Sequence, residues 1–193
     1  MQHDDRKLVG VILAGGEGRR LGGLDKGLQL YQSVALIDHV INRIAPQVDD
    51  LLICANRNLE QYQSFGHRVI QDQSTNFQGP MAGISTALSY LQQSDYENAM
   101  IVSCDTPKLP SDLVEKLTCA KHQGVAVAHD GTRRQNLHCL IHRGAWGSLI
   151  NAYQNGERAM HHWLNKAVAA EVDFSNQAAC FMNINTPEHL ELS

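Results

Sequence analysis

Short apolar runs alternate with amphipathic segments along most of the chain. The runs have the length and the flanking turn residues of buried strands, whereas the amphipathic segments repeat their apolar residues at helical spacing. Strands are therefore predicted at Leu8–Leu13, 51–55, Arg68–Ile70, 99–104, 125–128, in the segment that contains His138, around Val172 and at 181–184. Helices are predicted at 36–44 (ended by Pro46), 81–91, 111–122 (with Ser111 as N-cap), 145–153 and 159–168, with a last short helix opening at Thr186-Pro187.

This alternation predicts a single Rossmann-like α/β domain, with a mostly parallel sheet and helices on both of its faces. No repeat, low-complexity tract or linker divides residues 1–193, so one domain is expected. Ligands of such sheets bind outside the carboxyl ends of the strands. The loops of interest therefore follow Leu13, Ala55, Ile70 and Cys104.

Composition narrows the classes of partner. A net charge of −4 and an isoelectric point near 6.2 argue against a nucleic-acid partner, whose binding domains are usually basic, but allow a nucleotide. No stretch approaches the ~20 apolar residues of a membrane span, and the first apolar run is too short for a signal peptide. Five scattered cysteines without a C-x-x-C pair favour reduced thiols. We therefore expect a cytoplasmic protein.

The segment from Leu13 to Gly27 is rich in glycine and positive charge. Six of its last thirteen residues are glycine, and Arg19, Arg20 and Lys26 lie among them. Backbone N–H groups without neighbouring Cβ atoms can turn toward an anion, so the segment predicts phosphate binding. Neither the dinucleotide fingerprint nor the G-x-x-x-x-G-K-[ST] phosphate loop fits its spacing. A glycine-rich surface loop without function is the alternative.

Two carboxylates follow predicted strands at the same edge. Asp105 comes directly after 99–104, and Asp72 comes shortly after Arg68–Ile70 with a weaker signal. Mg²⁺ is usually held by one or two carboxylates together with substrate oxygens, so Asp105 is a candidate metal ligand. The alternative for both is an Asp that starts a turn. Small residues at 78–83, at a predicted helix start, would let a nucleobase or ribose approach the backbone.

Other catalytic chemistries find little support. His138 and His142 are four residues apart, but they lie in a predicted strand and the loop after it. His161 and His162 are adjacent and cannot easily share one helical face. Structural roles are therefore favoured over a zinc site. No G-x-S-x-G turn supports acyl transfer. Cys104 is interpreted as a small buried residue rather than a nucleophile.

Taken together, these segments resemble the molybdenum cofactor guanylyltransferases. The wider nucleotidyltransferase group opens with L-A-G-G-x-x-x-R-M-G-x-x-K, matched here by Leu13-Ala14-Gly15-Gly16, Arg20-Leu21-Gly22 and Lys26. The combination of Asp-Lys-Gly, Asp-Thr-Pro and Asn-x-Asn-Thr-Pro is more particular to the guanylyl branch and occurs at 25–27, 105–107 and 183–187. The resemblance covers nearly the whole chain, through further matches at 55–57, 69–72, 79–83, 156–158 and 172–175.

The resemblance implies transfer of GMP from GTP to Mo-molybdopterin with release of pyrophosphate. The terminal phosphate of molybdopterin would attack the α-phosphorus of GTP, so no protein nucleophile is needed. Lys26 would neutralise the phosphates, Asp105 would hold Mg²⁺, and residues 183–187 would face the pterin. The nucleotide-binding residues that the resemblance carries over are Leu13, Ala14, Gly15, Lys26, Asn56, Asp72 and Asp105. Cofactor-synthesis proteins and recipient apo-molybdoenzymes would be further partners.

Three positions depart from the pattern of the family. Leu21 replaces a methionine with little change in volume, Cys54 stands where the family tends to have asparagine, and Asn136 stands in place of a proline. Three alternatives remain open at this stage: cytidylyl transfer to the same pterin, nucleotidyl transfer to a sugar phosphate, and an adaptor that binds GTP without performing chemistry.

Overall fold

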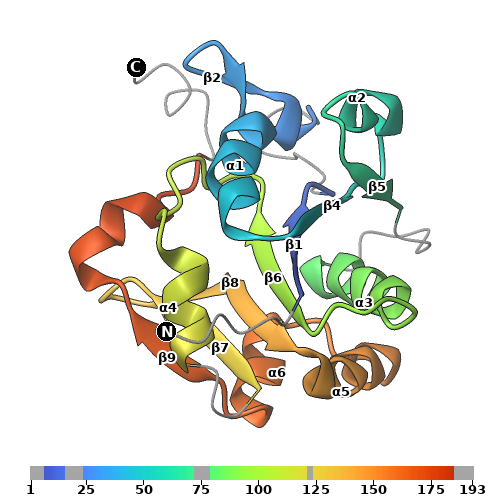
Figure 1. Cartoon of the computed structure of the whole chain (residues 1–193), viewed down its shortest axis with the longest axis vertical. Coiled ribbons are helices and arrows are strands. Elements are labelled where there is room, and N and C mark those ends of the chain that lie inside the picture. Colours follow the sequence, from blue (N-terminus) through green and yellow to red (C-terminus); the bar gives the residue numbers. More distant parts are fainter. Residues whose placement is uncertain (1–6, 16–23, 72–78, 121–123, 185–193) are drawn as a thin grey trace.

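A seven-stranded sheet forms the centre of the protein (Figure 1). The computed structural model describes residues 7–15, 24–71, 79–120 and 124–184. Within these residues the strands lie in the order β5-β4-β1-β6-β8-β7-β9, and only β8 runs antiparallel to its neighbours, so the predicted mostly parallel sheet is confirmed. The strands are β1 (Leu8–Leu13), β4 (Asp50–Cys54), β5 (Arg68–Ile70), β6 (Asn98–Ser103), β7 (Val125–His129), β8 (Arg134–His142) and β9 (Ala170–Asp173).

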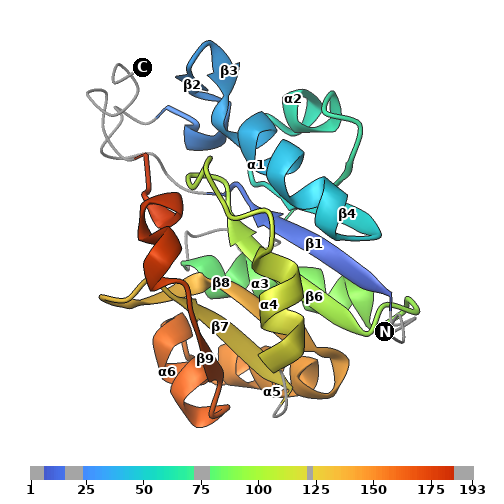
Figure 2. The ribbon, with the colours of Figure 1, turned by 60° about the vertical axis from the view of Figure 1, so that its left-hand side comes forward.

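Helices cover both faces of the sheet, as predicted; in Figure 2, α1 lies on one side of β1 and α3 on the other. One face packs against α1 (Leu36–Ile44), α2 (Leu59–Gln63) and α4 (Leu113–Ala120), and the other against α3 (Pro80–Leu91), α5 (Arg143–Gln154) and α6 (Met160–Lys166). Successive strand residues point to opposite faces, so Ile12 joins the first core and Val11 the second. None of the described helices has the length and apolar character to cross a membrane.

The carboxyl ends of β1, β4 and β6 meet at one edge of the sheet. Leu13 of β1 pairs with Cys54 of β4 on one side and with Ser103 of β6 on the other. Because β8 runs the opposite way, its pairing with β6 starts at Cys139 opposite Ile101. The residues of β8 before Cys139 therefore extend toward the same edge at which β6 ends.

Two predicted features are wrong. Residues 181–184 form no strand: Phe181 ends the 3₁₀ helix η4 (Ser175–Phe181), and Ile184 donates its N–H to the carbonyl oxygen of Asp105 (2.9 Å). The apolar residues of this run are buried separately, Phe181 in the main core and Ile184 beside Tyr31 and Leu36, so their spacing does not reflect a sheet. Ser111 is not an N-cap, because α4 begins only at Leu113.

Several short elements were not predicted from the pattern. They are α2, the 3₁₀ helices η2 (Lys26–Leu28) and η3 (Ala45–Gln47), and a hairpin of β2 (Leu30–Tyr31) and β3 (Val34–Ala35). The helix expected at Thr186-Pro187 lies outside the described residues. All five cysteines are free thiols, as expected.

Candidate active site

The carboxyl edge of the sheet brings three predicted loops into contact. The N–H of Ala14 donates to the carbonyl oxygen of Cys54 (2.8 Å), and the N–H of Cys104 donates to that of Leu13 (3.1 Å). A Cβ atom placed on Gly15 would lie 3.4 Å from the Nδ2 atom of Asn56. Leu13, Ala14, Gly15 and Asn56 therefore lie together at this edge, as the sequence predicts.

Lys26 and Asp105 form an ion pair between two loops of this edge. The Nζ atom of Lys26 donates to Oδ2 of Asp105, and the two side chains are only 16% and 14% exposed. The other carboxylate oxygen accepts a hydrogen bond from the hydroxyl of Ser103 (2.7 Å) and lies 3.3 Å from the hydroxyl of Thr106, whose single proton is also within reach of Asn183 (3.0 Å). The two predicted catalytic residues therefore lie side by side, with the carboxylate held by Lys26 and Ser103.

Asp25, which sequence reasoning did not select, anchors the segment that carries Lys26. Its buried carboxylate accepts hydrogen bonds from the hydroxyl of Tyr62 and from Nδ2 of Asn58 (3.0 Å), and it pairs with the guanidinium of Arg57 (3.5 Å). Burial, together with the negative charges nearby, raises the pKa of Tyr62. The available signal was a carboxylate directly before a catalytic lysine, but its partners lie 32 or more residues away and are visible only in the fold.

The absence of a side chain at Gly27 allows Tyr62 to pack closely against the segment that carries Lys26. A Cβ atom there would lie 2.5 Å from the hydroxyl oxygen of Tyr62 and 3.4 Å from the Sγ atom of Cys104. A side chain at this position would therefore displace either Tyr62 or the segment that carries Lys26.

The two cysteines at this edge are packing residues. Burial, followed by the charge of Asp105, raises the pKa of the Cys104 thiol, which disfavours the thiolate that a nucleophile needs. The thiol of Cys54 is buried and donates to the carbonyl oxygen of Gly83 in α3 (3.7 Å). The interpretation of Cys104 as a small buried residue is thus confirmed.

The start of α3 adjoins a later motif. Gly79 has a φ of 78°, which favours glycine, and a Cβ atom there would lie 3.6 Å from the carbonyl oxygen of Arg158. Segments 79–83 and 156–158, which both match the family named above, therefore lie against each other although they are far apart in the sequence. Asp72, Arg19, Arg20 and residues 185–187 lie outside the described residues.

The donor set of Asp105 fits Mg²⁺. Its hard carboxylate oxygens lie at a strand end beside a hydroxyl and a lysine, the surroundings in which Mg²⁺ is held by one protein carboxylate plus phosphate oxygens and water. Among the described residues, no group of three or more His, Cys, Asp or Glu side chains could hold a metal ion by themselves. A metal at Asp105 would therefore need the substrate to complete its coordination.

A cavity of about 260 Å³ opens beside Asp105, and we call it the β8 cavity. It is lined by Ser103, Asp105, residues 133–138 and Asn183. The guanidinium of Arg134 is already bound within the protein: it donates to Asn136 in the cavity wall (2.9 Å), to Asn165 (2.7 Å) and to the carbonyl oxygen of His161 (3.2 Å). Arg133, with a side chain 68% exposed, is the cation at the rim of this cavity among the described residues.

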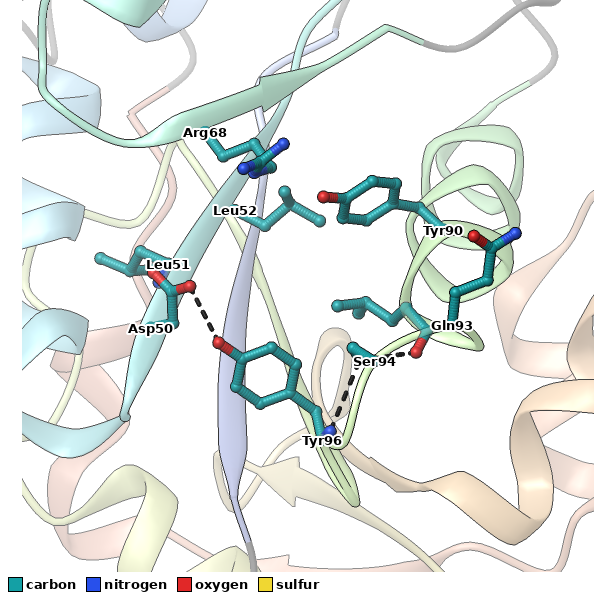
Figure 3. Close-up of a pocket in the computed structure, with 9 residues that line it drawn as sticks. Asp50, Leu51, Leu52, Arg68, Tyr90, Gln93, Ser94 and Tyr96 are labelled. Atoms are coloured by element: carbon teal, nitrogen blue, oxygen red, sulfur yellow. Dashed lines mark hydrogen bonds between the residues drawn. The ribbon is translucent and has the colours of Figure 1, made fainter.

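Another hollow, of about 380 Å³, lies at the opposite end of the sheet (Figure 3). It is framed by Tyr90 at the end of α3 and by Tyr96, whose hydroxyl donates to Asp50 at the start of β4 (2.9 Å). None of the predicted site residues lines it. The carboxyl edge of the sheet is therefore the candidate active site.

Comparison with known proteins places the chain in a family. Residues 10–172 match the MobA-like NTP transferase domain. Molybdenum cofactor guanylyltransferases of Shewanella piezotolerans and Shewanella halifaxensis are 46% and 42% identical to the chain; each alignment covers 92% of the chain, and 87% and 89% of the respective relative. The crystal structure of molybdopterin-guanine dinucleotide biosynthesis protein A from Archaeoglobus fulgidus has the same fold, with a TM-score of 0.74, 21% identity and 95% of each chain covered. The chain therefore belongs to the MobA-like NTP transferase domain family, among the molybdenum cofactor guanylyltransferases.

Proposed function

We propose that this nucleotidyltransferase transfers GMP from GTP to Mo-molybdopterin, forming Mo-molybdopterin guanine dinucleotide and pyrophosphate. The names of relatives at 42–46% identity support this reaction. The observation that carries it is the Lys26–Asp105 pair at the carboxyl edge, where the end of β1 and the β8 cavity also lie. Two substrates can approach this pair from two sides.

The nucleotide binds on the side of β1 and β4. Backbone groups of Leu13, Ala14 and Gly15 contact GTP, and Asn56 lies against Gly15 in a position to contact it as well. Asp72 belongs to the guanosine site in this proposal. The N–H of Ala14 is used within the sheet, so the donor that this stretch offers to a phosphate is the N–H of Gly15, which has no side-chain bulk beside it.

The reaction is a displacement at the α-phosphorus. An oxygen of the terminal phosphate of molybdopterin forms a bond to this phosphorus, and the bond to the bridging oxygen breaks, so pyrophosphate leaves with the electron pair. Lys26 neutralises charge on the phosphates and on the leaving group, and it exchanges its carboxylate partner for them. Positioning and charge stabilisation are sufficient for this class of transfer.

Asp105 is the residue that would hold Mg²⁺, which would supply charge neutralisation at the α-phosphate. Ser103 holds the Asp105 carboxylate in place through its Oδ1 atom. The oxygen that faces Lys26 is the one that changes partner when the substrates bind. Because the two oxygens of Asp105 have different partners, the carboxylate keeps its orientation in the free protein.

A pyrophosphate-release assay with GTP, Mg²⁺ and Mo-molybdopterin tests the proposal. We expect release that depends on all three components, with CTP in place of GTP as the control. A clear preference for CTP would reject guanylyl transfer in favour of cytidylyl transfer. Activity with a sugar phosphate in place of the pterin would reject Mo-molybdopterin as the acceptor. GTP binding without pyrophosphate release would support the adaptor.

A further inference from the structure

His138 is buried at the β8 cavity with no hydrogen-bond partner. Its side chain lines the cavity, the residue is 2% exposed, and neither ring nitrogen has a partner among the described residues. Buried polar groups are nearly always hydrogen-bonded, and an unsatisfied one costs free energy of folding. The fold therefore maintains an imidazole here that contributes little to the stability of the free protein.

An irregular part of β8 brings His138 to this place. The pairing of β8 with β7 shifts register between Cys139 and Arg134, so residues 135–138 stand outside the regular ladder. Irregularities of this kind redirect side chains and are common next to active sites. On its other side the imidazole packs edge-on against Phe181, with ring centroids 5.5 Å apart. The aromatic contact covers one side of the ring and satisfies neither nitrogen, and both are buried in the free protein.

The protonation state of His138 defines what it can bind. Burial lowers its pKa to about 4, so the imidazole is neutral near pH 7 and carries one N–H donor and one acceptor nitrogen. The amide groups of Asn136 and Asn183 line the same cavity, and each uses its oxygen as an acceptor, from Arg134 (2.9 Å) and Thr106 (3.0 Å) respectively. Their NH₂ groups have no partner among the described residues. These three side chains therefore form a neutral part of the cavity wall that can both donate and accept, beside the charged groups of Asp105 and Arg133.

We propose that His138 is a specificity-determining residue that hydrogen-bonds a polar group of the second substrate in the β8 cavity. This inference rests on the proposed function, because the second substrate must reach Asp105 and the cavity lies directly beside it. The ligand class is a phosphorylated acceptor with a neutral polar portion, such as a pterin, and Arg133 at the rim meets its charge. His138 positions the acceptor and takes no part in the bond-making step.

The test compares His138→Leu, His138→Asn and His138→Gln with the wild-type protein. Leucine removes both polar atoms, asparagine keeps an amide near the position of Nδ1, and glutamine keeps one near Nε2. We expect His138→Leu to raise the KM for Mo-molybdopterin about tenfold, as for one lost hydrogen bond, with the dissociation constant for GTP unchanged. One of the two amide variants should restore most of the KM and thereby identify the nitrogen that binds.

Thermal unfolding without substrate gives a readout independent of catalysis. We expect the Tm of His138→Leu to equal or exceed that of the wild type, because an unsatisfied polar group has been removed. His67→Leu, in the turn before β5, is the matched control and should leave the KM for Mo-molybdopterin unchanged. An unchanged KM in His138→Leu would overturn the assignment, and a lower Tm together with that unchanged KM would show a purely structural histidine.

Failure of the proposed function can be distinguished from failure of the His138 assignment. It appears in the wild-type protein, as absence of pyrophosphate release from GTP with Mo-molybdopterin, before any variant is compared. If the wild type uses a sugar phosphate instead, the same variants are assayed with that acceptor. A raised KM for it in His138→Leu supports the role of His138, and an unchanged KM overturns it.

Discussion

The hydroxyl of Tyr62 donates a hydrogen bond to the buried carboxylate of Asp25, so α2 is tied to the segment that carries Lys26. Asn58 and Arg57 bind the other carboxylate oxygen from the loop before α2. The position of Lys26 thus depends on a cluster formed from parts of the chain that flank β4. We therefore expect the proposed catalytic lysine to be sensitive to substitutions in this cluster that do not touch a substrate.

Tyr62→Phe should destabilise the protein and weaken catalysis moderately. The carboxylate of Asp25 stays buried but loses a donor, which costs about 1–3 kcal/mol of unfolding free energy. For a chain of this size the Tm should fall by about 2–4 °C per kcal/mol. Thermal unfolding and steady-state kinetics measure the two effects. An unchanged Tm would show that the hydrogen bond contributes nothing to stability.

Gly27→Ala should be more harmful in the wild type than in a Tyr62→Phe background. The new Cβ atom would lie 2.5 Å from the hydroxyl oxygen of Tyr62, and Phe removes that oxygen. Displacement of Lys26 by about 1 Å is enough to lower kcat by up to ~100-fold. A double-mutant cycle on kcat measures the coupling between the two positions. Additive effects would contradict the steric explanation.

Lys26→Ala and Asp105→Asn should each lower kcat by about 10²–10³-fold while the fold is retained, because each removes charge stabilisation from the transition state. The two variants should differ in their response to metal. Asp105→Asn should need more Mg²⁺ for half-maximal activity, whereas Lys26→Ala should keep the wild-type requirement. Arg68→Ala, in the hollow of Figure 3, is the control and should retain full activity. Near-normal transfer by Asp105→Asn would contradict the metal assignment.

His138 should make the folded protein sensitive to mild acid. Burial lowers its pKa in the fold to about 4, against 6.5 ordinarily, although the nearby charge of Asp105 acts in the opposite direction. Between these values the unfolded chain therefore binds a proton that the folded chain does not. Stability should therefore fall as the pH is lowered from 6.5 toward 4. Denaturant titrations across this range should show a shallower decline for His138→Leu than for the wild type or His67→Leu. Parallel curves would contradict this contribution.

Much of the fold could be predicted because strands and helices buried on one or two faces leave a periodic pattern. The run at Leu8–Leu13 is buried on both faces, is preceded by charged residues and is followed closely by glycines, so the pattern predicts it with its correct ends. The segment 181–184 has the same apolar character, but Phe181 and Ile184 are buried in separate places. A local pattern cannot distinguish a strand buried in the sheet from apolar residues that are buried in separate places.

The site could be predicted in part, for a related reason. Lys26 and Asp105 lie in motifs at strand ends, and parallel strands bring such ends together. Asp25 belongs to the Asp-Lys-Gly match, and the sequence favours a structural role for His138. What each side chain does depends on burial and on partners, present or absent, that only the fold defines. Such residues become visible when each buried polar atom is checked for a partner.

The reversed direction of β8 has a consequence for how this family can diversify. The residues at its amino-terminal end reach the predicted reacting edge from the side opposite to the predicted nucleotide loops. They belong to one short continuous segment, 133–138, in which residues 135–138 stand outside the regular ladder. Substitutions or insertions there would alter the acceptor side without moving β1 or β4. An engineer who wished to retarget the enzyme to a new acceptor would randomise this segment and leave the glycine segment intact.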